Sequence, residues 1–133
     1  MKFPWRSRKR MMRFESTREV ASQAAPGVTY WLRAMTFARR LELMRRVREL
    51  AGRLEFLQAG TDAEQKMDAG LLRAQIDREY VLWGLAAVSG LTVDGRAAGP
   101  ELLVESGPEP LFREVLLAVR AETGLSEEER KNL

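Results

Sequence analysis

The chain has 133 residues, a net charge of +3 and 45% hydrophobic residues, which is ordinary for one globular domain. It contains no cysteine and no histidine, which excludes disulfides, thiol chemistry and the commonest general base and transition-metal ligand at neutral pH. No apolar run in the sequence reaches the roughly 18 residues of a membrane span, and the N-terminus lacks the apolar stretch of a secretory signal. A cytoplasmic location without membrane contact is therefore expected.

The charges are distributed unevenly along the chain. Residues 1–60 carry 14 basic and 5 acidic side chains, a net charge of +9, whereas residues 61–133 carry 8 and 14, a net charge of −6. Such polarity favours an acidic partner for the first half, or attraction between two halves or two copies. Residues 1–26 are predicted to form a flexible basic arm, because 1–14 contain six basic residues and no acid.

Residues 27–133 are predicted to form a mainly α-helical domain with a short β element. The segment 28–35 alternates between two faces and contains aromatic residues, which predicts a short strand. That strand needs a partner strand, for which 14–22 and 91–98 are the candidates. Within 91–98, Asp94-Gly95 is a favoured two-residue hairpin turn.

A long helix is predicted over 37–58, with Thr36 as its N-cap. An apolar stripe at steps of four and three residues runs along it and resembles a heptad pattern, which favours pairing with another helix or a second copy. Arg40 and Arg48 flank the stripe and have no acid three or four residues away. They are either contacts to a partner or cations in solvent. The stripe comprises Leu43, Val47, Leu50, Leu54 and Leu57.

A second helix is predicted from 62 to 89, and its apolar residues fall on two opposite faces. Such a helix is either buried between two layers or presents one face to a partner. The first face comprises Met67, Leu71, Ala74, Val81, Leu85 and Val88. The second comprises Leu72, Ile76, Tyr80, Trp83 and Ala87.

Two further helices are predicted near the end of the chain. Pro100 starts a short one through Glu105, and Pro108 starts another that ends near Gly124. The run Ser126–Glu129 has the form of a further helix start, which either frays or is completed by something outside the chain.

The sequence contains no P-loop, GxSxG, HExxH or EF-hand pattern. A non-enzymatic protein without cofactor or metal is therefore expected. Basic side chains could contact phosphates, so a nucleic-acid-associated or regulatory protein is an alternative. Nucleic acid is the less favoured partner, because known binding motifs are absent and the acidic half would repel a polyanion.

Three stretches carry a family resemblance: GVTYWLRAMTFARRLELMRRVREL at 27–50, YVLWGLAAVSGLTVDG at 80–95 and FREVLLAVRAETGLSEEERKN at 112–132. They resemble the small tail-assembly chaperones of tailed bacteriophages and prophages. The resemblance implies a helical, non-enzymatic protein that binds the tape-measure protein and helps to recruit tail-tube subunits in the host cytoplasm. It also implies a longer frameshifted form in many members. A structural tail or neck subunit is a further alternative.

On this hypothesis, the expected partner-binding residues come from both long helices, and a homo-oligomer is also expected. The residues are Arg40, Leu43, Val47, Arg48, Leu50, Leu54, Leu72, Ile76, Tyr80 and Trp83.

Overall fold

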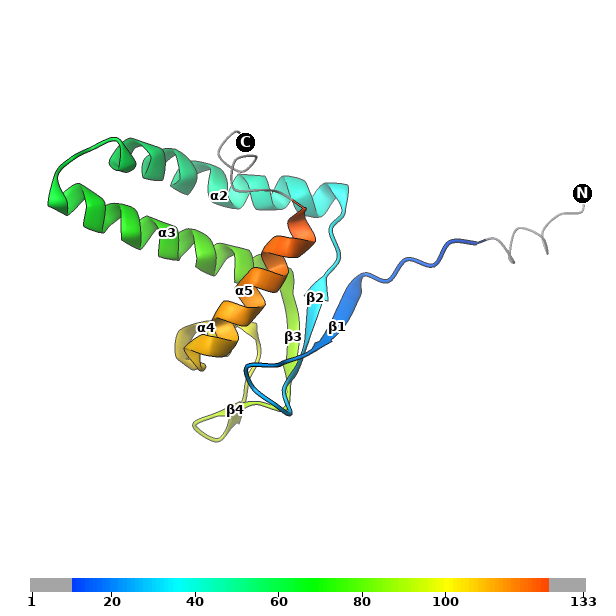
Figure 1. Ribbon diagram of the computed structural model, residues 1–133. Coiled ribbons are helices and arrows are strands. Elements are labelled where there is room, and N and C mark those ends of the chain that lie inside the picture. Colours follow the sequence, from blue (N-terminus) through cyan, green and yellow to red (C-terminus); the bar gives the residue numbers. More distant parts are fainter. Residues whose placement is uncertain (1–10, 125–133) are drawn as a thin grey trace, which may run out of the picture.

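The computed structural model describes residues 11–124, and helices make up most of this range (Figure 1). They are α2 (Phe37–Gln58), α3 (Ala63–Gly84), α4 (Pro100–Ser106) and α5 (Glu109–Thr123). The predicted class, a mainly helical domain with a small β element, is confirmed at this level. The bounds predicted for α2 agree with the structure, and the Thr36 hydroxyl accepts the expected hydrogen bond from Arg39 N–H at 3.1 Å.

In the described part of the chain, five short strands form two small antiparallel sheets. The strands β1 (Thr17–Ala21), β2 (Thr29–Arg33) and β3 (Leu85–Ser89) pair in the order β1-β2-β3. The strands β4 (Thr92–Val93) and β5 (Arg96–Ala97) form the predicted hairpin, with Asp94 and Gly95 at positive φ angles of 49° and 80°. These angles are the left-handed values that a tight two-residue turn requires.

The central strand β2 has one expected neighbour and one unexpected neighbour. β1 lies within 14–22, as predicted, but the other partner is β3 rather than the 91–98 hairpin. The second helix was therefore predicted five residues too long, because it ends at Gly84 instead of residue 89. Pairing between Tyr30 and Val88 overrides the local helical preference of the Ala86-Ala87 segment.

The predicted arm over 1–26 is also shorter than expected, because β1 belongs to the sheet. Residues 11–16 are exposed and lead away from the sheet in Figure 1. The rest of the basic arm, 1–10, and the predicted helix start at Ser126 lie outside the described residues.

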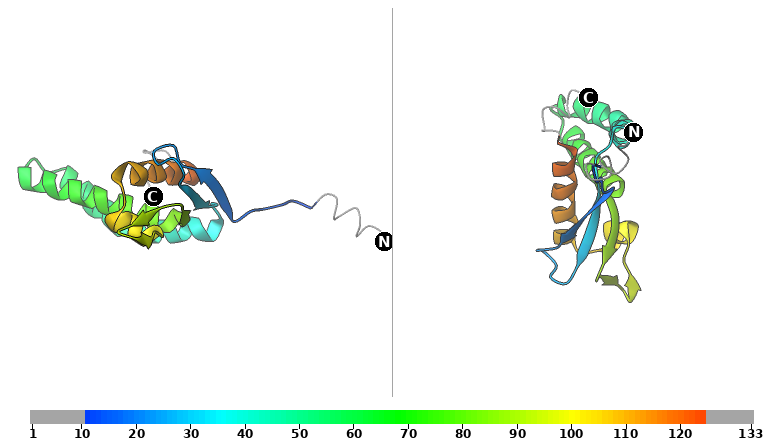
Figure 2. Two further views of the ribbon diagram at one scale, coloured as in Figure 1. Left: turned by 90° about the horizontal axis from the view of Figure 1, so that it is seen from below. Right: turned by 90° about the vertical axis from the view of Figure 1, so that its right-hand side faces the viewer.

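Helix α5 lies along one face of the three-stranded sheet and packs against the C-terminal half of α3 (Figures 1 and 2). The contact requires a glycine at 84, since a methyl group there would lie 2.5 Å from Val119 Cγ1. The core between these elements includes Tyr30, Leu32, Val81, Leu85, Leu103, Leu111, Val115 and Val119.

Helices α2 and α3 form an antiparallel hairpin that extends well beyond α5 and the sheet (Figures 1 and 2). Asp62 caps α3 and accepts a hydrogen bond from Glu64 N–H at 3.1 Å. In the projecting half of the hairpin, each helix packs mainly on the other. One side of each helix is therefore left uncovered there.

Candidate functional site

The apolar stripe of α2 faces α3. Leu43 and Val47 are buried, and Leu50 and Leu54 are partly buried against the core. This stripe therefore makes the contact within the hairpin, and its predicted role as a surface between copies is corrected. Charged substitutions at Val47 and Leu54 would therefore disrupt this packing.

The face of α3 that was predicted to bind a partner is also internal. Leu72, Ile76, Tyr80 and Trp83 are all buried, because they pack against the α2 stripe and the core. These four residues do not form an accessible surface in this fold, and the prediction is corrected. The sequence correctly indicated two apolar faces but assigned the exposed role to the wrong one.

The exposed apolar residues of α3 are on its other face. Met67 and Leu71 are 72% and 64% exposed, whereas Val81 on the same predicted face is buried. The difference follows from α5, which covers the C-terminal half of α3 and leaves the N-terminal half open (Figure 1).

Helix α2 has a second, exposed stripe opposite its buried one. Its members follow steps of four, four, three, four and four residues, a spacing that keeps them on one side of a helix. All six are exposed, and Phe37 and Phe56 are 80% and 74% exposed. We call this stripe the outer face of α2; it comprises Phe37, Leu41, Arg45, Arg48, Gly52 and Phe56.

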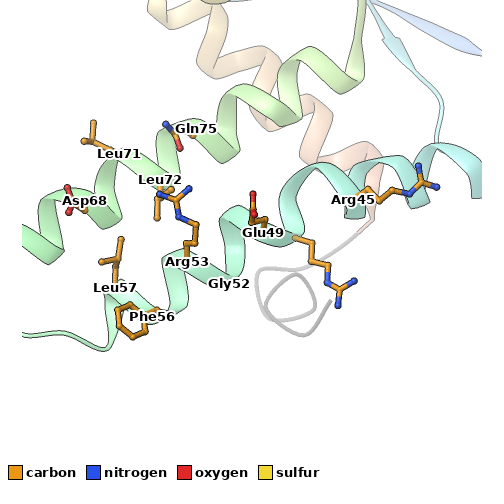
Figure 3. Close-up of a pocket in the computed structure, with 11 residues that line it drawn as sticks. Arg45, Glu49, Gly52, Arg53, Phe56, Leu57, Asp68, Leu71, Leu72 and Gln75 are labelled. Carbon is orange, nitrogen blue, oxygen red and sulfur yellow. The ribbon is translucent and has the colours of Figure 1, made fainter.

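A depression of about 880 Å³ extends from the outer face of α2 onto α3 (Figure 3). It is open to solvent, which suits a chain segment better than an enclosed small molecule. Arg53 reaches from α2 toward α3, while Phe56 and Leu71 point away from the opposite helix. The lining comprises Arg45, Arg48, Glu49, Gly52, Arg53, Phe56, Leu57, Asp68, Leu71, Leu72 and Gln75.

The charged groups of this depression form no ion pair with any other side chain among residues 11–124. Within residues 11–124, none of its three arginines lies within 4.0 Å of a carboxylate. Arg46 instead pairs with Glu42 at 3.5 Å, as its spacing predicts, and with Glu79 at 3.6 Å. Of the two predicted cations, Arg48 lines the depression, whereas Arg40 is half-buried and lies outside it.

Arg39, which the sequence did not single out, lies at the base of the hairpin. There it connects the start of α2 to the end of α3 through Trp83. Its guanidinium lies 4.8 Å from the centre of the Trp83 ring and donates a hydrogen bond to the Trp83 carbonyl. Trp83 Nε1 donates to the Arg39 carbonyl at 2.9 Å. Burial lowers the pKa of Arg39, although Glu42 at 2.9 Å opposes that shift. The sequence could have indicated Arg39 by its position three residues before Glu42, a spacing at which two helical side chains can form an ion pair.

Glu114 on α5 is a second group that sequence reasoning missed. Its carboxylate accepts hydrogen bonds from Ala24 N–H at 2.7 Å, the Tyr30 hydroxyl at 2.8 Å, the Ser22 hydroxyl at 3.1 Å and Gln23 N–H at 3.2 Å. Burial alone would raise the pKa of Glu114, but these donors outweigh it and hold the pKa below its ordinary value of 4.5. Burial and the hydrogen bond to Glu114 raise the pKa of Tyr30, so its phenol stays protonated.

The donors around Glu114 connect the β1–β2 loop to α5, which is a structural role. Among residues 11–124, no group of three or more acidic side chains is placed to hold a metal ion. The same residues include no helix long and apolar enough to cross a bilayer. The exposed apolar side chains of the α2–α3 hairpin are thus the feature on which function can be argued.

Comparison with known proteins adds no relative: no family model, curated protein or solved structure matches the chain.

Proposed function

We propose that this chain is a tail assembly chaperone of a tailed bacteriophage or prophage. In this role it binds the tape-measure protein through exposed apolar residues of the α2–α3 hairpin and helps to recruit tail-tube subunits. The proposal is carried by one observation: large apolar side chains lie exposed on the two helices. They are Phe37, Leu41, Phe56, Met67 and Leu71.

A partner that covers these side chains removes apolar surface from water, which favours association. Each large apolar side chain removed from water contributes roughly 1.5–3 kcal/mol to association, before the costs of ordering the partners. A concentration of such side chains on one projecting hairpin is typical of a protein-binding surface. A long helical client with an apolar stripe could lie along it.

The stretches that carry the sequence resemblance cover the base of the hairpin and not its projecting half. The stretch 27–50 contains β2 and most of α2, and the stretch 80–95 contains the end of α3 and strand β3. Both therefore include elements that hold the base of the hairpin. The resemblance supplies the identity of the client, while the exposed residues supply the means of holding it.

Co-expression with the long helical, tape-measure-like protein that the proposal implies as client tests the proposal. We expect the wild-type chain to keep that protein in the soluble fraction, and the double variant Phe56→Ser/Leu71→Ser to lose most of this effect. Leu117→Ser on α5 is the matched control, because Leu117 is 67% exposed but lies away from the hairpin.

Circular dichroism should show the same helical content in all three chains, since the replaced side chains are exposed. If the tape-measure-like protein is equally soluble with and without the wild-type chain, the proposed function is wrong.

A further inference from the structure

We propose that the outer face of α2 binds an amphipathic helix whose apolar stripe is flanked by acidic residues, and that this helix crosses α2 at Gly52. The inference rests on the proposed function and specifies the chemistry of the segment that is bound.

Gly52 forms the low point of the outer face. A Cβ atom at this position would meet nothing within 4 Å, so no packing within the described fold requires a glycine. A glycine in an exposed helix is also less favourable than an alanine. Arg48 and Phe56 lie one turn to either side, and both line the depression. A partner helix crossing between them could approach at the short end of the usual 8–10 Å interaxial range.

The arginines of this surface determine which charged residues the partner should carry beside its apolar stripe. Arg45 and Arg48 lie on the outer face and Arg53 beside it, and none has an ion-pair partner within residues 11–124. A guanidinium binds a carboxylate through two parallel hydrogen bonds. Glu49 and Asp68 also line the depression and would repel an acid placed directly above them. Acidic residues of the partner are therefore expected over the arginines at the Arg45–Arg48 end.

The shape of the surface favours a helix over other occupants. From Phe37 to Phe56 the outer face is about 28 Å long, at 1.5 Å per residue. Its apolar side chains stand at both ends, with the arginines and the glycine between them. A partner helix that crosses at Gly52 would match this order if its apolar stripe faced Phe56 and one acidic flank faced Arg45 and Arg48. The two carboxylates in the lining disfavour a nucleic-acid backbone.

A pair of synthetic peptides tests the inference on the full-length chain. Both form a 20-residue helix with the same leucine stripe, flanked by glutamate in one peptide and by lysine in the other. By fluorescence anisotropy, we expect the wild-type chain to bind the glutamate peptide at least about tenfold more tightly, which corresponds to 1.4 kcal/mol. The variant Arg45→Glu/Arg48→Glu should reverse this preference.

Gly52→Leu fills the crossing point and should weaken binding of the glutamate peptide at least about tenfold, a change of 1.4 kcal/mol. Gly70→Leu is the matched control: Gly70 is also exposed, helical and open to solvent, but does not line the depression. The affinity of the Gly70→Leu chain for the glutamate peptide should equal that of the wild type. Leucine is a better helix former than glycine, so neither variant should lose helical content.

Three results would overturn the inference. They are equal affinity for the two peptides, equal affinity of the wild-type and Gly52→Leu chains, or tighter binding of duplex DNA than of either peptide with a steep dependence on salt.

The same variants separate this inference from the proposed function. If Gly52→Leu keeps the tape-measure-like protein as soluble as the wild type does, the proposed function stands and the crossing at Gly52 is wrong. If the wild-type chain keeps none of it soluble, the proposed function fails whatever the peptides do.

Discussion

Replacing Trp83 with alanine is expected to lower the free energy of unfolding by about 3–5 kcal/mol. Trp83 is 1% exposed and is among the largest fully buried side chains. Its removal would leave a cavity at the base of the α2–α3 hairpin, where α3 passes into β3. It would also remove the ring beneath the Arg39 guanidinium and the donor to the Arg39 carbonyl. Within residues 11–124, the buried Arg39 Nε already lacks a hydrogen-bond partner.

Trp83→Phe separates packing from hydrogen bonding. Phenylalanine keeps an aromatic ring under Arg39 but loses the Nε1 donor, so a smaller loss is expected, on the order of 1–3 kcal/mol. Urea unfolding followed by circular dichroism measures both variants. A loss below about 1 kcal/mol for Trp83→Ala would be far outside the range for a buried tryptophan. It would contradict the described packing of the hairpin base.

Replacing Glu114 with glutamine is the second change with a large expected effect. The carboxylate collects donors from the β1–β2 loop and from Tyr30, and hydrogen bonds to a charged group contribute about 1.5–3 kcal/mol each. Glutamine offers one acceptor oxygen and places an NH₂ group among donors. We expect a loss of about 1.5–3 kcal/mol at pH 7.

The lowered pKa of Glu114 determines how the stabilising effect of this side chain changes with pH. The pKa of Glu114 is lower in the folded chain than its ordinary value of 4.5. The ionised group therefore stabilises the fold above the unfolded-state value, and this contribution disappears as the pH falls through the folded-state value. The wild type and Glu114→Gln should differ in urea midpoint at pH 7 and converge in acid. A constant difference from pH 7 to pH 3 would show that the Glu114 charge does not stabilise the fold.

The helices were predictable because their ends carry local signals. Thr36, Pro100 and Gly124 mark boundaries through capping, a fixed φ angle and a left-handed C-cap, all of which act within one turn. The strand β3 was missed because it depends on pairing with Thr29–Leu32, more than 50 residues earlier in the chain. No local pattern in Leu85–Ser89 distinguishes that pairing from a continued helix.

The candidate surface was only partly predictable for a related reason. Periodicity showed that α3 has two apolar faces, but which one is covered depends on where α2 and α5 lie. On α2, the apolar periodicity came mainly from the buried stripe. The exposed residues Phe37, Leu41 and Phe56 on the opposite side were therefore not recognised as a second stripe. Arg40 was chosen over its neighbour Arg39, although adjacent residues on a helix point about 100° apart. Only the packing shows that Arg39 is the one against Trp83.

The most direct test of the proposed function is site-specific photo-crosslinking in a complex with the tape-measure-like protein. A photoreactive amino acid is placed at Phe56, at Leu71 or at Leu117, which are 74%, 64% and 67% exposed. Similar exposure means that non-specific apolar contact would label all three positions alike. We predict strong crosslinks from Phe56 and Leu71, on the hairpin, and little from Leu117, on α5. Equal crosslinking at the three positions, or crosslinking from Leu117 alone, would contradict binding through the α2–α3 hairpin.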